Sequence, residues 1–406
     1  MSNIIVQKFG GTSVGSDERI SAVAQIIKNA KKDNQVIVVV SAMSGETNRL
    51  INLAKSFGDN PDRREFDALI STGEKVSASL LAMALNSIGV KAKSFSASQI
   101  SMKTTDHHSK AKIIDLNAEK ILATLNEDIV PIITGFQGVT ESGDVTTLGR
   151  GGSDTTAVAI AAHVNAVRCD IYTDVDGVYT CDPRMVEKAK KLERISYEEM
   201  LEFASLGAKV LQTRSVEMAM RHNVIVQVLS SQTGKKGTFL TKEDKKMENE
   251  LVSGIAYTKD EAKITLINIL DNPGVAAKIF VPLSKNNINV DMIVQTGSEN
   301  GKNINFTYTV SRKALKKAIL IMEDNKNNIN FERIITNDSL AKVSIIGLGM
   351  RTHTGVADKM FSALASENIN IHVISTSEIK ISVLINEELV KKALETLHTK
   401  FELDSY

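Results

Sequence analysis

Three loops that combine glycine with charged residues hold most of the side chains that could do chemistry. The first loop, Lys8–Ser13, reads Lys-Phe-Gly-Gly-Thr-Ser and lies between an apolar run and a stretch with helical spacing. Consecutive glycines let backbone N–H groups approach an anion, and the start of a helix adds positive potential. The lysine adds a mobile cation. Taken alone, the loop fits a phosphate site and a plain turn between strand and helix equally well.

The second loop, Thr146–Thr156, reads Thr-Thr-Leu-Gly-Arg-Gly-Gly-Ser-Asp-Thr-Thr. Arg150 offers a planar fork that matches a carboxylate, and the glycines beside it let a ligand approach the backbone. Ser153 or Asp154 could cap the helix that follows, and a cap needs no further function. Since a cap does not require Arg-Gly-Gly before it, the run favours a site for an anionic substrate.

The third loop, Ile171–Arg184, starts in a predicted strand and is rich in aspartate, hydroxyl groups and turn-forming residues. An ordinary loop explains most of its Asp, Gly and Pro residues. The additional carboxylates and the arginine also suit a nucleotide with its metal ion. Glu74 lies apart from the loops at the start of a predicted helix, where the helix dipole favours an acid. Capping and catalysis are therefore both open for Glu74.

Several familiar catalytic signatures are absent from the sequence. Neither G-x-x-x-x-G-K-[ST] nor a full G-x-G-x-x-G occurs, and the seven histidines show no metal-ligand spacing. The two cysteines, Cys169 and Cys181, are too few for a disulfide framework or a structural zinc site. No nucleophile–base pair stands out. We therefore expect no metal ion that is bound by the protein alone.

The elements that must position these loops alternate between short apolar runs and amphipathic stretches. Ile4–Val6 is a predicted strand, Asp17–Lys32 has the apolar spacing of a helix, and Val36–Val40 reads as a strand buried on both faces. The same alternation continues to Val224–Leu229. This rhythm predicts an α/β fold around a mostly parallel sheet, whose ligands bind at the carboxyl ends of the strands.

The 406-residue chain has 49 basic and 48 acidic side chains, 42% hydrophobic residues and 24% charged residues. This length predicts two or three domains, and the composition is typical of a globular protein. The net charge of +1 gives no electrostatic argument for nucleic acid or an anionic membrane. No apolar run approaches the roughly 20 residues of a membrane helix, and no signal peptide is evident. We expect a cytoplasmic protein that binds neither nucleic acid nor membrane.

An internal repeat follows the lysine-rich stretch Lys242–Glu250, which marks a predicted domain boundary. Lys263–Ile267 matches Lys342–Ile346, and Gly274–Phe280 matches Gly355–Phe361. Each copy predicts a strand, a helix, two strands and a second helix. Two copies are too few for a solenoid, so we expect a pseudo-symmetric pair of small domains.

Together, the loops and the repeat resemble the aspartokinases, members of the amino-acid kinase fold family. The motifs that carry the resemblance follow the family's order along nearly the whole chain: Lys8–Val14, Ser71–Glu74, Thr147–Asp154, Tyr172–Arg184, Ser196–Met200, Gly207–Leu211 and the repeat. The resemblance implies a three-layer α/β/α kinase domain with a mostly parallel sheet at residues 1–245. It also implies two ferredoxin-like ACT domains at 263–335 and 336–406, the second completed by 250–262.

The resemblance implies transfer of the γ-phosphoryl group of ATP to the side-chain carboxylate of L-aspartate, the first step of the lysine, threonine and methionine pathway. The product would be 4-phospho-L-aspartate. A carboxylate with a pKa of about 3.9 is ionised at neutral pH, so the acceptor needs no general base. Catalysis then depends on positioning and on cations that stabilise the transferring group. The ATP phosphates would carry Mg²⁺.

The family's residue roles can be transferred to the matching positions of this chain. Lys8 would contact the transferring phosphoryl group, Asp154 would organise Lys8, and Arg150 would clamp a substrate carboxylate. Glu74 would bind the substrate ammonium group. The rest of the aspartate pocket is implied at Ser41, Thr47, Gly151, Gly152 and Ser153. The ATP site is implied at Lys8, Phe9, Gly10, Gly11, Thr173, Asp174, Tyr179, Asp182, Arg184 and Lys209.

The ACT domains of this family bind feedback amino acids, so lysine, threonine or both are the implied effectors. The turn before each repeat helix is the predicted site, since backbone donors at a helix start suit a carboxylate. Met350–Gly355 has no Asp-Asn-Pro in the second copy, which leaves open whether both copies bind the same effector. The candidate effector residues are Asp271, Asn272, Pro273, Gly274, Ala276, Asn289, Gln295, Thr296, Ser375 and Thr376.

Other functions remain open beside a regulated aspartate kinase. A sister kinase could act on glutamate, carbamate or a nucleotide, although Arg150 and Glu74 as a carboxylate-plus-ammonium pair argue against nucleotide acceptors. An amino-acid sensor could carry an inactive kinase domain, and a purely structural α/β protein is a further alternative. Exposed strand edges in small ACT-like units favour a homodimer or larger oligomer. Met247 could also be an internal start that yields a separate regulatory subunit.

Overall fold

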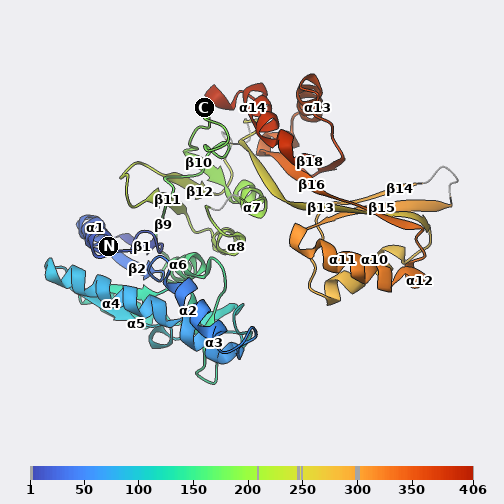
Figure 1. Cartoon of the computed structure of the whole chain (residues 1–406). Helices are drawn as coiled ribbons and strands as arrows, with labels where there is room; N and C mark the ends of the chain where they lie inside the picture. The colour runs from blue at the N-terminus through green and yellow to red at the C-terminus, as the bar shows by residue number, and fades with distance from the viewer. Residues whose placement is uncertain (1–2, 208–209, 245–246, 248–249, 298–301, 406) are drawn as a thin grey trace. The chain divides into compact units, whose positions relative to one another are not determined.

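The computed structural model describes residues 3–207, 210–244, 247, 250–297 and 302–405. Within these residues the chain divides into two compact units (Figure 1). The first unit comprises Met1–Tyr179 and Lys191–Met247, and the second comprises Thr180–Lys190 and Glu248–Tyr406.

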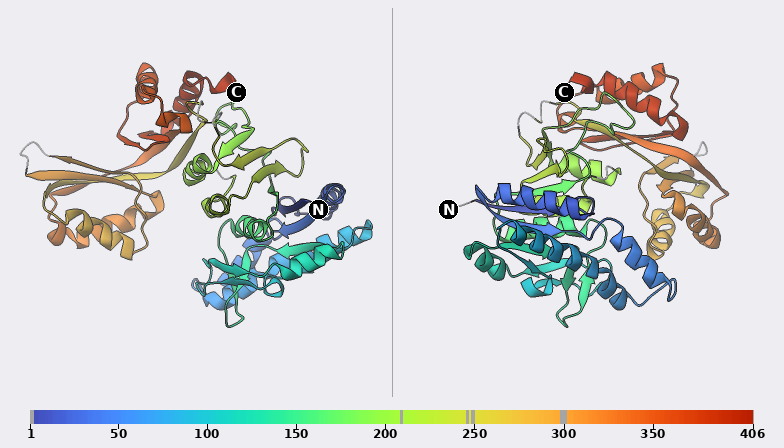
Figure 2. Two further views of the ribbon diagram at one scale, coloured as in Figure 1. Left: turned by 180° about the vertical axis from the view of Figure 1, so that it is seen from behind. Right: turned by 60° about the vertical axis from the view of Figure 1, so that its left-hand side comes forward.

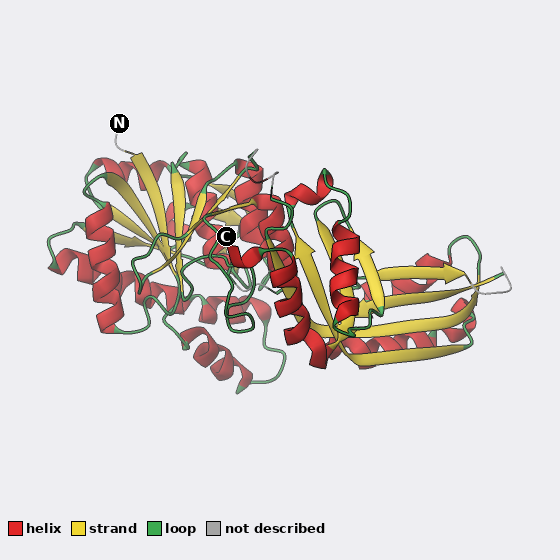
Figure 3. Cartoon of the chain, turned by 90° about the horizontal axis from the view of Figure 1, so that it is seen from above, coloured by secondary structure: helices red, strands yellow, loops and turns green. Residues whose placement is uncertain are grey.

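A mostly parallel sheet forms the centre of the first unit, which confirms the α/β prediction. Its strand order is β10-β12-β11-β9-β1-β2-β6-β3, and among these described pairs only β11–β12 is antiparallel. In Figure 3 the strands of this sheet fan out with helices on both sides. The strands are β1 (Asn3–Phe9), β2 (Asn34–Val40), β3 (Ala92–Phe95), β6 (Val130–Thr134), β9 (Arg168–Thr173), β10 (Arg194–Ser196), β11 (Val226–Ser230) and β12 (Thr238–Thr241).

Helices cover both faces of this sheet because side chains alternate along each strand. Ile5 and Phe9 of β1 join a hydrophobic core with α1 and α4, whereas Lys8 points to the opposite face, toward α6. The described helices of this unit are α1 (Asp17–Ala30), α2 (Glu46–Lys55), α3 (Arg63–Ile70), α4 (Thr72–Ser87), η1 (Ser98–Ile100), α5 (Glu119–Asn126), α6 (Gly152–His163), α7 (Tyr197–Ser205) and α8 (Thr213–His222).

The register of the parallel strands brings their carboxyl ends together. Phe9 at the end of β1 is level with Val40 of β2 and Tyr172 of β9, and Val40 is level with Thr134 of β6. The loops that follow these strands therefore start at one edge of the sheet, where α/β proteins bind ligands.

A four-stranded sheet, in the order β5-β4-β7-β8, carries the chain toward the second glycine-rich loop. Its last strand, β8, ends at Thr147, directly before Leu148-Gly149-Arg150. The position of Arg150 is thus set by how β8 is held in place. The strands are β4 (Met102–Thr104), β5 (Ile113–Leu116), β7 (Gln137–Val139) and β8 (Val145–Thr147).

The helical stretch Arg63–Ser87, which contains α3 and α4, has the length and hydropathy of a membrane span. Half of its most apolar window is nevertheless buried within the protein, where Leu81 and Leu85 join the core of the first unit. Asp67 and Glu74 of the same stretch are buried as well. We interpret the stretch as two core helices of this unit.

The second unit contains both copies of the repeat in one six-stranded sheet with the order β14-β15-β13-β16-β18-β17. The long strands β13 and β16 pair along most of their length, so each takes part in both halves of the sheet (Figure 2). The two copies bury separate cores against their own helices. The strands are β13 (Gly254–Leu270), β14 (Ile293–Gly297), β15 (Asn303–Val310), β16 (Arg333–Ile346), β17 (Val373–Thr376) and β18 (Lys380–Asn386). The helices are α10 (Val275–Lys285), α11 (Arg312–Asp324), α12 (Lys326–Ile329), η2 (Leu348–Arg351), α13 (Val356–Ser366), η3 (Glu387–Leu389), α14 (Val390–Lys400) and η4 (Leu403–Ser405).

The segment Thr180–Lys190 belongs to the second unit, although the chain on either side of it belongs to the first. Cys181 and Val186 are buried in the core of the second copy, and the Thr180 carbonyl accepts a hydrogen bond from the Ile255 amide at 2.7 Å. The predicted kinase domain at residues 1–245 included this segment. The structure divides the chain differently because these apolar side chains are buried in the second unit.

Tyr308 is fully buried in the first copy, and its hydroxyl has no hydrogen-bond partner among the described residues. A buried unpaired hydroxyl costs about 1–3 kcal/mol. We therefore expect Tyr308→Phe to raise the free energy of unfolding of this unit by about 1 kcal/mol, since the ring stays and the unpaired group is removed. Thermal denaturation of the full chain tests this. Tyr197→Phe is the control, because that buried hydroxyl donates to the Val224 carbonyl at 2.8 Å and its loss should lower Tm. A lower Tm for Tyr308→Phe would contradict the expectation.

Candidate active site

The end of β1 brings Lys8 to the start of α6. Lys8 Nζ lies 2.6 Å from Asp154 Oδ1, and both residues are 8% exposed. Gly151 caps the helix with a φ of 71°, a left-handed conformation that favours glycine. The start of α6 also contributes the positive potential of a helix N-terminus. A lysine, its paired carboxylate and a helix start thus converge at one point.

Glycines are required on the other side of Lys8 because backbone segments approach each other closely there. The Gly10 amide donates to the Tyr172 carbonyl at 3.1 Å. A Cβ on Gly11 would lie 2.8 Å from the Ala42 carbonyl oxygen, which is too close for any other residue. The loop after β1 is thereby held against the loop after β2.

These loops enclose a cavity of about 450 Å³ in the first unit. All of the predicted aspartate-site residues, Asp154 and five of the ten predicted ATP-site residues line it. They are Lys8, Gly10, Gly11, Ser41, Thr47, Glu74, Arg150, Gly151, Gly152, Ser153, Asp154, Thr173 and Asp174.

Glu74 presents a buried carboxylate to this cavity from the first turn of α4. Its Oε1 accepts a hydrogen bond from the Ala42 amide at 3.2 Å, whereas Oε2 is buried and has no partner among the described residues. Burial raises the pKa of Glu74 to about 7. An ammonium group would remove the cost of this buried charge.

Arg150 differs from Glu74 in being exposed at the edge of the cavity. Its guanidinium makes no hydrogen bond or ion pair with any residue that the structure describes, which leaves its donors available for a ligand. Glu74 and Arg150 together offer one anion and one cation, the complement of an amino acid's ammonium and carboxylate groups.

The predicted nucleotide residues are only partly brought together. Thr173 and Asp174 line the cavity, with Thr173 Oγ1 donating to Asp174 Oδ1 at 3.1 Å. Tyr179 donates instead to Asp176 at 2.7 Å and does not line the cavity. Asp182 and Arg184 belong to the second unit and pair with each other at 2.8 Å.

Phe9 and Lys209 are the two remaining residues predicted to bind the nucleotide, and the structure describes only Phe9. Phe9 is fully buried and stacks on Tyr172 with ring centroids 4.6 Å apart, so its side chain serves the core and does not line the cavity. The alternation along β1 that directs Lys8 toward α6 directs Phe9 to the opposite face of the sheet, into the core. Lys209 lies outside the residues that the structure describes.

Sequence reasoning missed part of the cavity wall. Phe136 follows β6 with a φ of 68°, an uncommon value for a bulky residue, and its amide and carbonyl are fixed by Thr156 and Leu148. The Gly135-Phe136 position directly after a predicted parallel strand was the available signal. The other unpredicted lining residues are Thr12, Ala42, Met43, Ser44, Gly45, Gly149, Val210 and Gln212.

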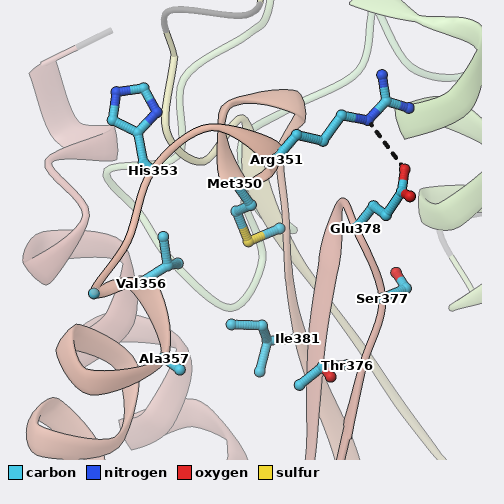
Figure 4. A pocket seen from close by; sticks show the side chains of 10 residues that line it. Met350, Arg351, His353, Val356, Ala357, Thr376, Ser377, Glu378 and Ile381 are labelled. Carbon is cyan, nitrogen blue, oxygen red and sulfur yellow. Dashed lines mark ion pairs between the residues drawn. The ribbon is translucent and has the colours of Figure 1, made fainter.

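The second unit has a cavity of its own, of about 470 Å³, in the second copy of the repeat (Figure 4). Arg351 and Glu378 form an ion pair at its edge with a 3.7 Å separation, and Thr376 lines it from the end of β17. Of the two predicted second-copy residues, Thr376 lines this cavity and Ser375 does not. The first-copy candidates are all exposed: Asp271, Asn272, Pro273, Gly274, Ala276, Asn289, Gln295 and Thr296.

Comparison with known proteins agrees with the two-unit organisation. Residues 3–230 match the amino acid kinase family, and residues 264–325 and 343–401 match the ACT domain. An aspartate kinase of Pseudomonas putida is 52% identical over 404 residues, which cover 99% of this chain and 98% of that protein. The chain belongs to the aspartate kinases. The predicted family membership, the amino acid kinase fold with ACT domains and the ATP-dependent kinase activity are thereby confirmed.

Solved structures of an aspartate kinase share the fold of the whole chain. E. coli aspartokinase III in complex with aspartate and ADP, in its R-state, has a TM-score of 0.81 and 28% identity, covering 98% of this chain and 99% of that one. The same E. coli enzyme in complex with lysine and aspartate, in its T-state, has a TM-score of 0.80 at the same coverage.

Proposed function

We propose that this aspartate kinase transfers the γ-phosphoryl group of ATP to the β-carboxylate of L-aspartate and forms 4-phospho-L-aspartate. The observation that carries the proposal is the single cavity that holds the Lys8–Asp154 pair together with Glu74 and Arg150. Glu74 would bind the α-ammonium group of aspartate and Arg150 its α-carboxylate. The β-carboxylate would then extend toward Lys8, with Ser41, Thr47 and Ser153 completing the pocket.

Positioning and charge would supply the catalysis. The aspartate β-carboxylate is already ionised at neutral pH, so no residue needs to remove a proton. The obstacle is repulsion between this anion and the ATP phosphates, which Lys8 and the start of α6 would offset. Asp154 would fix the Lys8 ammonium by the 2.6 Å contact between them.

The nucleotide would bind along the loops after β1 and β9. Gly10 and Gly11 would contact phosphates, and Thr173 and Asp174 would bind the rest of the nucleotide. Tyr179 and Lys209 remain part of the proposed nucleotide set. Mg²⁺ usually keeps several waters and binds substrate phosphates, so we propose that it enters with ATP.

The choice of acceptor can be tested by measuring ADP formation with a set of aspartate analogues. We expect L-aspartate to be preferred over L-glutamate. N-acetyl-aspartate lacks the ammonium group and aspartate α-amide lacks the α-carboxylate, and each should lower kcat/KM by about 10²-fold because Glu74 or Arg150 is left unpaired. ADP formation that does not depend on aspartate, or that is faster with glutamate, would overturn the proposal.

We also propose that the ACT domains regulate the kinase through lysine, threonine or both, at the first step of the pathway that makes lysine, threonine and methionine. The E. coli relative was solved with lysine, which supports an amino-acid effector. The second-copy cavity has an arginine and a glutamate at its edge, which suit an amino acid. Strand edges of the ACT sheet would pair between chains of an oligomer, and the enzyme would act in the cytoplasm.

Thr376→Ala tests the proposed effector cavity. We expect the effector concentration for half-inhibition to rise about tenfold, since a hydrogen-bonding group that lines the cavity is lost, with kcat unchanged. Inhibition is measured with lysine, threonine, both and neither. Asp271→Ala is the matched variant in the first copy and reports whether that copy binds effector as well. Inhibition of Thr376→Ala at the same effector concentrations as the unchanged chain would contradict the assignment.

A further inference from the structure

Asp67 of α3 is fully buried outside the cavity, yet its carboxylate is the centre of a hydrogen-bond network. It accepts hydrogen bonds from the Thr147 amide at 2.9 Å and the Thr147 hydroxyl at 2.7 Å. It also accepts them from the Ser109 amide at 2.8 Å and the Ser109 hydroxyl at 3.2 Å, and His108 Nδ1 lies 3.1 Å away. A buried carboxylate with this many partners is strongly held in one orientation.

The two main partners of Asp67, Thr147 and Ser109, both contact or belong to the loop that carries Arg150. Thr147 is the last residue of β8, three positions before Arg150. Ser109 packs against the same loop, because a Cβ on Gly149 would lie 3.0 Å from the Ser109 carbonyl oxygen. Gly149 has a φ of 76°, so the turn between Thr147 and Arg150 is itself tightly constrained.

A second anchor holds the far side of this loop. The Arg214 guanidinium of α8 donates to the Leu148 carbonyl and, at 2.8 Å, to the Ala111 carbonyl. The backbone on either side of Gly149 is therefore fixed, while the Arg150 side chain stays exposed.

Asp67 is also tied to the element that carries Glu74. The Ser71 amide donates to the Asp67 carbonyl at 3.1 Å, and α4 begins at Thr72. The Ser71 carbonyl accepts a hydrogen bond from Gln137 Nε2 at 2.9 Å, which links this junction to β7. One residue thus joins the segment that bears Glu74 to the loop that bears Arg150.

We propose that Asp67 is a positioning residue that sets the spacing between Arg150 and Glu74 and thereby the affinity of the enzyme for aspartate. The inference rests on the proposed function, in which these two side chains bind the α-carboxylate and α-ammonium groups. A small displacement of either group would misplace the β-carboxylate relative to the phosphoryl group, and displacements of about 1 Å can cost about 10²-fold in rate. Among the described residues, the hydrogen bonds to the Asp67 carboxylate come from Ser109, Thr147 and His108, and none comes from the proposed nucleotide residues.

The test is the isosteric variant Asp67→Asn in the full chain. It keeps the shape of the side chain but loses its charge. One acceptor oxygen is also replaced by an amide NH₂ group, which cannot accept the hydrogen bonds that Ser109 and Thr147 donate to Asp67. We expect the KM for aspartate to rise at least about tenfold, with the KM for ATP within about twofold. A purely structural role would lower the folded fraction, and so the apparent kcat, while leaving both KM values unchanged.

Asp144→Asn is the matched control, because Asp144 also links α3 to the hairpin that ends in β8. Its carboxylate accepts from Arg64 Nε at 2.9 Å, but the pair is partly exposed and neither residue lines the cavity. This variant should leave both KM values within about twofold, as exposed ion pairs contribute little.

Thr147→Val keeps the test decisive if Asp67→Asn does not fold. It removes one of the hydroxyl bonds to Asp67 and keeps the strand-favouring shape, so the KM for aspartate should rise about threefold. If the unsubstituted enzyme is active and the folded variants have the same KM for aspartate as that enzyme, this inference is overturned and the proposed function is not. If the unchanged chain forms no product from aspartate, the proposed function fails and this inference fails with it.

Discussion

Lys8→Ala is expected to lower kcat by at least about 10³-fold, because it removes the cation nearest the proposed phosphoryl position. The substitution also leaves the Asp154 carboxylate, 8% exposed, without its partner at 2.6 Å. An anion at the place where an anion must bind would repel ATP as well. The measurement is steady-state kinetics with ATP and aspartate, with calorimetry for ATP and effector binding.

Two variants separate the parts of this effect. Lys8→Arg keeps the charge but not its compact geometry, and we expect partial activity. Asp154→Asn keeps Lys8 but removes the carboxylate that holds it, so its loss of kcat should be smaller than that of Lys8→Ala. Effector binding should be unchanged in all three variants. A kcat for Lys8→Ala within tenfold of the unchanged enzyme would remove Lys8 from the catalytic role.

Glu74→Gln is expected to stabilise the unliganded enzyme and to raise the KM for aspartate by about 10²-fold, since a buried charge pair with the ammonium group is lost. The buried carboxylate has a pKa of about 7 in place of 4.5. In the folded enzyme it is protonated below pH 7, whereas in the unfolded chain it ionises at about pH 4.5. The free energy of unfolding contributed by this group is therefore lost as pH rises from 4.5 through 7.

The stability difference should appear at alkaline pH and disappear at acid pH. At pH 8 the Glu74→Gln variant should exceed the unchanged enzyme in free energy of unfolding by up to ~3 kcal/mol, and the two should converge near pH 5. Thermal unfolding at both pH values measures this. Added aspartate should raise Tm for the unchanged enzyme and not for the variant. A variant with a normal KM for aspartate would contradict the ammonium-binding role.

The pH dependence of aspartate use follows from the same carboxyl group. Only the ionised form of Glu74 can pair with an ammonium group, so kcat/KM for aspartate should rise between pH 6 and pH 8. In Glu74→Gln this rise should be absent.

The sheet and the three loops were predictable from the sequence because their signals are local. The β-branched run Val36–Val40 is buried throughout, as expected of a central parallel strand. Lys8, Arg150 and Asp154 lie in glycine-rich runs directly beside such strands, and the parallel register brings these runs to one cavity. Family resemblance then gave a role to each.

The remainder of the site depends on contacts that no local pattern encodes. Phe136 lines the cavity because its backbone is fixed by Thr156 and Leu148, which are distant in sequence. Asp67 looks like an ordinary helix residue, and its importance comes from Ser109 and Thr147 on other elements.

The assignment of Thr180–Lys190 to the second unit was likewise not predictable from the sequence. Thr180–Lys190 follows the predicted nucleotide loop, and nothing in its sequence indicates that Cys181 is buried in the second unit. In the repeat, the pattern predicted two similar copies. The pairing of β13 with β16 across both of them required the structure.

The most direct test of the central claim is to trap the acyl phosphate with hydroxylamine. Purified protein is incubated with Mg-ATP and L-aspartate, and the hydroxamate is identified by mass spectrometry and by comparison with α- and β-aspartyl standards. We expect the β-hydroxamate, which should depend on both ATP and aspartate and should be lost in Lys8→Ala. Product with glutamate but not with aspartate, or no hydroxamate with any acceptor despite measurable amino-acid binding, would contradict the central claim.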